Sequence, residues 1–177
     1  MKSIYFFLAL LIPLINFGQS TSCTIDEDGN NFENAEFGLD LKYIANDFDI
    51  AEGTSMEIEK IIPTIVNNIG VADIFIYEDD NGQPGNLITS FDDVTPTSQT
   101  LVSNNFNLPW YEVELDLPTS ITLEGLTGGS KYWIGLTTTV GSGGGSNNFW
   151  EIKTNGTTAF THTSIDQGAT WTISPSG

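Results

Sequence analysis

The octapeptide "WYEVELDL" (residues 110–117) alternates apolar and acidic side chains almost without interruption. Successive side chains of a β-strand point to opposite sides of the sheet, so every second residue shares a face. A segment with one apolar and one acidic face predicts an antiparallel strand that lies on the core with one face and in water with the other. The predicted core face carries Tyr111, Val113, Leu115 and Leu117, and the predicted water face carries Trp110, Glu112, Glu114 and Asp116.

Short apolar stretches of this kind recur along the chain from residue 36 onward, separated by clusters of Gly, Pro, Asn, Asp and Ser. They are rich in Thr, Ile, Val and aromatic residues, which suit a pleated surface, and no window shows the spacing of an amphipathic helix. We predict strands at residues 40–50, 56–66, 71–78, 87–91, 97–103, 110–117, 120–123, 131–139, 148–154, 158–163 and 170–174, with "GSGGGSNN" (residues 141–148) as a long loop. Many short strands with regular turns indicate an all-β fold, and we expect a two-sheet antiparallel β-sandwich, jelly-roll-like.

The first twenty residues, "MKSIYFFLALLIPLINFGQS", have the features of a secretory signal peptide: a charged start, a short apolar run, and small residues at the end. The apolar run is too short to cross a bilayer, which takes ~20 residues, so we predict no membrane span. We expect residues 1–20 to be removed on export, residues 21–35 to form an acidic leader or loop, and residues 36–177 to form a single β-sandwich domain. The protein would then be secreted or held at the cell surface. Cys23 has no partner within the chain, and it could be free, paired outside this sequence, or lipidated.

The chain is strongly acidic, with a formal net charge of −18 and no arginine. Contacts to phosphate need clustered Lys and Arg, so nucleic acid is not expected as a partner. The charge fits a solubility role in an exported protein, and it also leaves cation binding open.

The stretch "IYEDDNGQPGNLI" (residues 76–88) gathers acids, amides, glycines and a proline between apolar flanks. It fails as an EF-hand loop, because Gly82 at position 6 would put Tyr77 and Ile88 at the first and last ligand positions. Two adjacent acids on an extended chain also point apart, which disfavours a catalytic pair. We therefore predict a tight turn at Asn81-Gly82 and a second bend at Pro84-Gly85.

Three stretches together resemble one known kind of module: "ANDFDIAEGTSMEIEKI" (45–61), "VADIFIYEDDNGQPGNLI" (71–88) and "WYEVELDLPTSITLEGLTGGSKYWIGL" (110–136). They are similar to jelly-roll-like β-sandwich domains of secreted, often multidomain proteins of Bacteroidota-type bacteria, which often precede a type IX secretion sorting segment. The resemblance covers about residues 40–175, and an extra glycine before the Tyr-Trp pair departs from the pattern. Its motifs are structural, so the resemblance implies a fold and an extracellular setting but no site residues.

Exposed aromatic rings on a sheet face are typical of sugar-binding sandwiches, because a ring stacks on the apolar face of a pyranose while amides and acids bind its hydroxyls. Strand alternation places four aromatic residues opposite the predicted core residues: Trp110, Trp133, Tyr77 and Phe75. These four are candidates for a binding platform, although large aromatics in a two-layer fold are also commonly core or edge cover.

A structural calcium ion is a further possibility. In "DEDGNN", Asp26, Asp28 and Asn30 have the spacing that opens an oxygen-ligand calcium loop, although position 6 is not glycine and position 12 is Phe37. The same residues fit a solvated acidic leader better than a calcium loop. Asp47 and Asp49 in "NDFD" are weaker candidates.

Signs of catalysis are weak. His162, the single histidine, has Ser164 and Asp166 nearby in sequence, but a catalytic triad draws on separated segments, and no G-x-S-x-G elbow is present. We interpret His162 as a strand-surface residue. We expect no enzymatic centre, and the predicted function is binding or adhesion to an extracellular glycan or surface protein, with calcium support as an option. The alternatives are a passive appendage of a larger exported hydrolase and a stand-alone hydrolase using two carboxylates.

Overall fold

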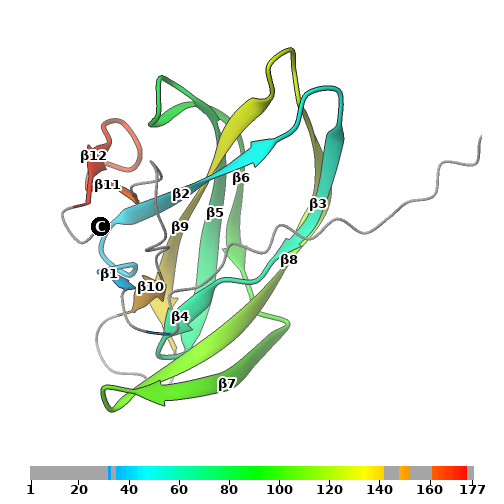
Figure 1. Ribbon diagram of the computed structural model, residues 1–177. Coiled ribbons are helices and arrows are strands. Elements are labelled where there is room, and N and C mark those ends of the chain that lie inside the picture. Colours follow the sequence, from blue (N-terminus) through cyan, green and yellow to red (C-terminus); the bar gives the residue numbers. More distant parts are fainter. Residues whose placement is uncertain (1–31, 33–34, 142–147, 152–160, 175–177) are drawn as a thin grey trace, which may run out of the picture.

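The computed structural model describes residues 32, 35–141, 148–151 and 161–174, and this part of the chain forms β-strands without any helix (Figure 1). A helix that could span a membrane is therefore absent from these residues. The strands in chain order are β1 (Ala35–Phe37), β2 (Tyr43–Ile50), β3 (Ser55–Ile61), β4 (Thr64–Val66), β5 (Ile69–Asp79), β6 (Pro84–Val94), β7 (Ser98–Asn105), β8 (Leu108–Glu124), β9 (Ser130–Val140), β10 (Phe149–Glu151), β11 (His162–Ser164) and β12 (Thr172–Ile173).

Antiparallel pairing arranges these strands in two sheets. The first sheet has the order β1-β10-β4-β8-β3, and β7 also pairs with β8. The second sheet has the order β12-β11-β2-β9-β5-β6. Figure 1 shows the two sheets as facing layers. The predicted two-sheet antiparallel β-sandwich is confirmed.

Strand β8 is longer than expected, because it joins the two strands predicted at residues 110–117 and 120–123. Pro118 lies between them and has no amide hydrogen to donate, which usually interrupts a strand. Here β3 pairs with β8 up to Ile58 and Ile121 and resumes at Lys60 and Asp116, so Pro118 falls in the irregular interval. The bulge accommodates the proline, and the strand continues through it.

The strand predicted at residues 56–66 is divided instead. It forms β3 and β4, which follow one another along the same edge of β8. Pro63 separates them, and its carbonyl accepts a hydrogen bond from the amide of Val113 at 3.0 Å. Strand β1 was not predicted. The predicted segments 148–154 and 158–163 and the loop at 141–148 lie partly outside the described residues.

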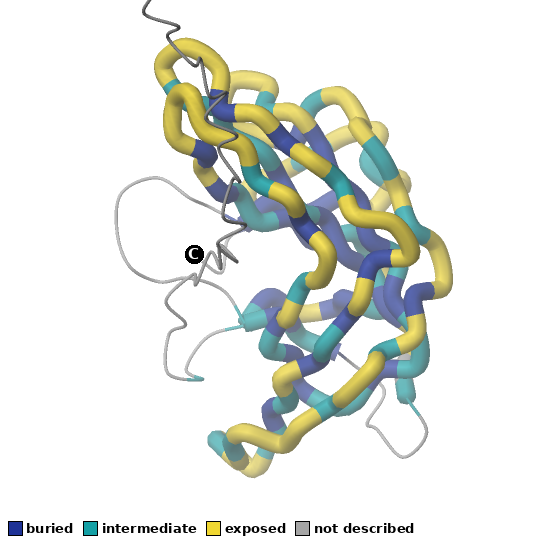
Figure 2. The backbone as a smooth tube through the Cα atoms, turned by 90° about the vertical axis from the view of Figure 1, so that its right-hand side faces the viewer, coloured by how far each residue is buried: buried dark blue, intermediate teal, exposed yellow. Residues whose placement is uncertain are grey.

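The core lies between the two sheets, and the alternation in "WYEVELDL" predicts it correctly. Val113, Leu115 and Leu117 are buried, whereas Glu112 and Asp116 are exposed. Figure 2 shows buried and exposed segments alternating along the strands. The core cluster draws on both sheets: Leu39, Ile44, Phe48, Ile50, Ile58, Ile65, Ile69, Ala72, Ile74, Ile76, Val94, Val113, Leu115, Leu117, Leu123, Leu136 and Trp150.

Candidate functional site

The β5–β6 connection is a two-residue hairpin turn, as predicted for Asn81-Gly82. Asn81 has φ 57° and Gly82 has φ 87°, and the amide of Asp80 donates to the carbonyl of Gln83 at 2.8 Å. Positive φ at both central residues defines a type I′ turn, which Asn-Gly adopts readily. The second predicted bend at Pro84-Gly85 is wrong, because these residues begin β6.

Asp79 holds this turn against the sheet. Its carboxylate accepts the amide of Gly82 at 3.1 Å and 3.2 Å, and its Oδ1 also accepts the indole Nε1–H of Trp133 at 2.9 Å. Asp80 next to it accepts only a local hydrogen bond among those seen in the described residues, from Nδ2 of Asn81 to Oδ1 at 2.8 Å. The two neighbouring carboxylates therefore differ: that of Asp79 is engaged on both oxygens, and Oδ2 of Asp80 remains open.

The loop between β11 and β12 is built around Asp166. Its carboxylate accepts the hydroxyl of Thr170 at 2.6 Å, the hydroxyl of Ser164 at 2.7 Å and the amide of Thr170 at 2.9 Å. These bonds, led by the hydroxyl of Thr170, lower the pKa of Asp166 to about 2, because they stabilise the charged form. The loop turns back through Gln167 (φ 61°) and Gly168 (φ 84°), and it presents Trp171 at its end.

This loop packs on the outer face of the second sheet, over a group of rings that we call the outer aromatic cluster: Tyr43, Phe75, Tyr77, Trp133 and Trp171. Tyr43 stacks on Phe75 with ring centroids 4.4 Å apart, and Trp171 meets Tyr77 edge-on at 5.4 Å. Gly168 lies directly over Tyr77, since a Cβ there would be 2.8 Å from the Tyr77 hydroxyl. Burial raises the pKa of Tyr77 to about 12.

Three of the four predicted platform residues thus come together on one face. Phe75 and Tyr77 lie opposite the core pair Ile74 and Ile76, as alternation predicts. All three rings are buried, however, with Trp133 1% exposed, Tyr77 4% and Phe75 8%, which agrees with the alternative of core or edge cover. The alternation identifies the face correctly but gives no information about the loop that covers it.

Trp110, the fourth predicted platform residue, lies apart on the outer face of the first sheet and is only 2% exposed. Trp110 pairs with Val66 on β4, Val66 in turn pairs with Phe149 on β10, and Phe149 pairs with Phe37 on β1. Phe32 packs edge-on against its indole at 5.6 Å. For Trp110, too, the burial agrees with the alternative of core or edge cover.

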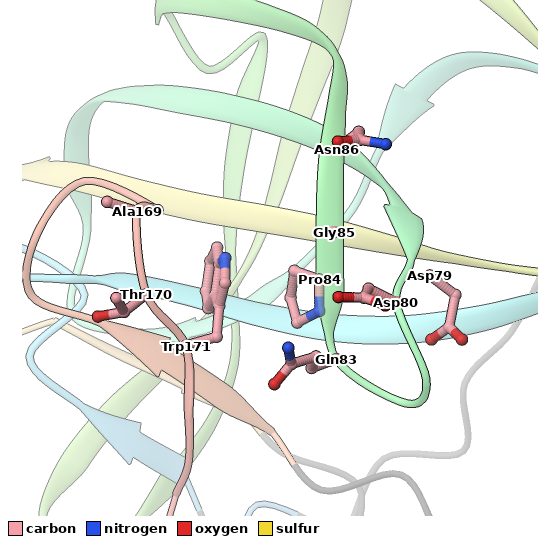
Figure 3. A pocket seen from close by; sticks show the side chains of 10 residues that line it. Asp79, Asp80, Gln83, Pro84, Gly85, Asn86, Ala169, Thr170 and Trp171 are labelled. Carbon is pink, nitrogen blue, oxygen red and sulfur yellow. The ribbon is translucent and has the colours of Figure 1, made fainter.

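A pocket of about 600 Å³ opens beside the outer aromatic cluster, between the β5–β6 turn and the β11–β12 loop. In Figure 3, Trp171 and Thr170 stand on one side, and the side chains of Asp80 and Gln83 extend toward Trp171 from the other. The carboxylate of Asp79 is directed away from Trp171 in this view. The lining residues are Asp79, Asp80, Gln83, Pro84, Gly85, Asn86, Gly168, Ala169, Thr170 and Trp171.

The pocket residues Gln83, Asn86, Thr170 and Trp171 were not predicted as site residues. Trp171 falls within the strand predicted at residues 170–174, but in the structure it precedes β12 and is half-buried. The polar turn at residues 79–86 was the one sequence feature that pointed to the pocket. No local pattern connects that turn with residues 168–171.

The three residues considered for catalysis have structural contacts. His162 lies on β11 as predicted, but the prediction that it is a surface residue is wrong, because it is buried edge-on against Trp133 with ring centroids 4.8 Å apart. Ser164 donates to Asp166 and accepts the amide of Gly168 at 2.8 Å. Ser164 and Asp166 thus organise the loop.

The strongest calcium candidates, Asp26, Asp28 and Asn30, lie outside the described residues, as do Cys23 and the predicted signal peptide. Asp47 forms an ion pair with Lys131, and Asp49 lies 3.7 Å from the same ammonium group. A lysine between two carboxylates favours an ion pair over a metal site. Across residues 32, 35–141, 148–151 and 161–174, no three His, Cys, Asp or Glu side chains form a group that could hold a metal.

Comparisons with protein-family models, with curated proteins and with solved structures returned no match for this chain.

Proposed function

We propose that this protein is a non-catalytic binding module, exported to the cell surface or beyond, whose pocket between the β5–β6 turn and the β11–β12 loop binds carbohydrate. The observation that carries this proposal is the position of Trp171 opposite Asp80 and Gln83 across the pocket (Figure 3). An aromatic ring can cover the apolar face of a sugar, and carboxylate and amide groups can bind its hydroxyls.

Both walls of the pocket are held in place by internal contacts. The type I′ turn and the Asp79 hydrogen bonds fix the β5–β6 wall. The Asp166 hydrogen bonds fix the loop that carries Thr170 and Trp171. A site that is already ordered loses little conformational entropy when it binds a ligand, so this rigidity supports a binding role.

A binding role also agrees with how the reactive groups are used. The carboxylates of Asp79 and Asp166 are engaged in holding their loops, and His162 packs against Trp133. Calcium support, which rests on Asp26, Asp28 and Asn30, stays a prediction.

The test is a glycan-array screen of the full chain with and without calcium, followed by calorimetry on the best ligand. We expect Trp171→Ala and Gln83→Ala to weaken binding. Phe106→Ala is the matched control, because Phe106 is an exposed aromatic on the β7–β8 turn of the other sheet. Trp171→Phe should retain most of the affinity, since it keeps a ring and Nε1 of Trp171 has no hydrogen-bond partner in the described part of the chain.

Equal binding by the wild type, Trp171→Ala and Gln83→Ala would place the ligand elsewhere and reject this site. A calcium requirement would instead direct attention to the acidic segment at residues 26–31.

A further inference from the structure

The pocket is lined by hydrogen-bond acceptors and carries negative charge without a compensating cation. Asp79 and Asp80 both line it, and none of its ten lining residues is Lys, Arg or His. Glu78 stands just behind, where its carboxylate accepts Nδ2 of the lining residue Asn86 at 3.0 Å. Lys131 interacts with Asp79, but its ammonium group is bound by Asp47. A ligand in this pocket therefore meets unbalanced negative charge.

Asp80 is the carboxylate that is free to contact a ligand. Asp79 is committed to Gly82 and Trp133, and Asp166 is committed to Thr170 and Ser164. Asp80 is exposed, and its side chain points to the side of the pocket on which Trp171 stands, with Pro84 between the two in Figure 3. A cation in the pocket would meet a carboxylate on one wall and an indole ring on the other, which is an arrangement that attracts ammonium groups.

The charge of the whole chain acts in the same direction. A formal net charge of −18 attracts cationic ligands over long range and repels polyanions, so sulfated and uronic-acid glycans are poor candidates.

We propose that the ligand is a glycan bearing protonated primary amines, such as a deacetylated amino sugar, with its ammonium group between the carboxylate of Asp80 and the ring of Trp171. This inference rests on the proposed function, because it assumes that the pocket binds carbohydrate. Hydroxyls of the same sugar would face Gln83 and Thr170, which line the same walls.

The experiment is calorimetry on the full chain with three oligosaccharides of equal length and the same linkage. These are a glucosamine oligomer, its N-acetylated counterpart and a glucose oligomer, and oligolysine is added as a probe of charge alone. We expect the glucosamine oligomer to bind about tenfold more tightly than either neutral sugar, the effect of adding one partly screened ion pair and one cation–π contact.

Variants separate this contact from general attraction. Asp80→Asn should weaken binding of the glucosamine oligomer about two- to fivefold more than it weakens binding of the neutral sugars. Glu112→Gln removes the same charge from an exposed position on the other sheet and should have little effect. Raising the pH until the ligand amine is neutral should abolish the preference.

The outcomes distinguish the two proposals. If the neutral sugars bind as tightly as the glucosamine oligomer, the cationic preference is rejected and carbohydrate binding stands. If oligolysine binds equally well and Asp80→Asn behaves like Glu112→Gln, the attraction is non-specific and the inference fails. If no oligosaccharide of this set binds, this inference fails, and the glycan-array screen decides whether the pocket binds another carbohydrate.

Discussion

Alanine at position 168 should destabilise the loop over the outer aromatic cluster, because two separate penalties meet there. Gly168 has φ +84°, a backbone conformation that costs an L-residue about 1–2 kcal/mol. The added Cβ would also lie 2.8 Å from the Tyr77 hydroxyl, and 3.7 Å from atoms of both Trp171 and Tyr43. Overpacking of this kind typically costs about 1–3 kcal/mol. The expected loss of unfolding free energy for Gly168→Ala is therefore about 2–5 kcal/mol.

A matched substitution isolates the backbone part. Gly128 has φ +90°, and a Cβ added there would meet nothing within 4 Å. Gly128→Ala should thus cost only the backbone penalty of about 1–2 kcal/mol. The difference between the two variants measures the contact with the cluster.

Urea denaturation of Gly168→Ala, Gly128→Ala and the double variant Gly168→Ala/Tyr77→Phe is the assay, with the single Tyr77→Phe change completing the cycle. Removing the Tyr77 hydroxyl should recover part of the loss in the double variant, because the closest atom to the new Cβ is gone. Equal costs for positions 168 and 128, together with no recovery from Tyr77→Phe, would refute the packing of this loop on Tyr77.

Three further predictions concern pH and turn chemistry. The pKa of Asp166 is lowered to about 2, so the stability that its carboxylate contributes should be complete above the unfolded pKa of about 3.9 and be lost as the pH falls toward 2. Denaturation curves between pH 6 and pH 2 should show this loss of stability in the wild type and a smaller loss in Asp166→Asn. The pKa of Tyr77 is raised to about 12, so the folding stability that the neutral Tyr77 contributes should be complete below the unfolded pKa of about 10 and decline as the pH rises toward 12. A spectrophotometric titration in which every tyrosine ionises near pH 10 would contradict the burial of Tyr77. Phe106 is 68% exposed and has φ 55° in the β7–β8 turn, a left-handed conformation that Asn tolerates better than Phe. Phe106→Asn should therefore raise the unfolding free energy by about 1 kcal/mol. A loss of stability on thermal denaturation would contradict a left-handed backbone at this position.

The predictions are confirmed where they depend on neighbouring residues. Side-chain alternation identifies the core face at Val113 and Leu115, and it separates Ile74 and Ile76 from Phe75 and Tyr77. The turn at Asn81-Gly82 follows from backbone preferences of two adjacent residues. These features depend on a period of two residues or on a single tight turn, so a short window of sequence contains the required information.

The predictions fail where distant segments meet. Strand β8 continues through Pro118 because its pairing with β3 is irregular there. Pro63 instead divides the segment predicted as one strand at residues 56–66 into β3 and β4. Trp133 is covered because the β11–β12 loop returns to the same face, with Gly168 placed over Tyr77. Trp171 joins the pocket for the same reason.

The amino-acid sequence is sufficient to specify an acidic all-β chain, the face of each strong strand and the tight turn after β5, because alternation, charge and turn preferences are properties of neighbouring residues. The exposure of an outward ring and the composition of the pocket depend on which loop lies beside which strand. Residues 79–86 and 168–171 are adjacent only after the second sheet has brought β5 and β6 together with β11 and β12, so the site at their junction is a product of the tertiary fold.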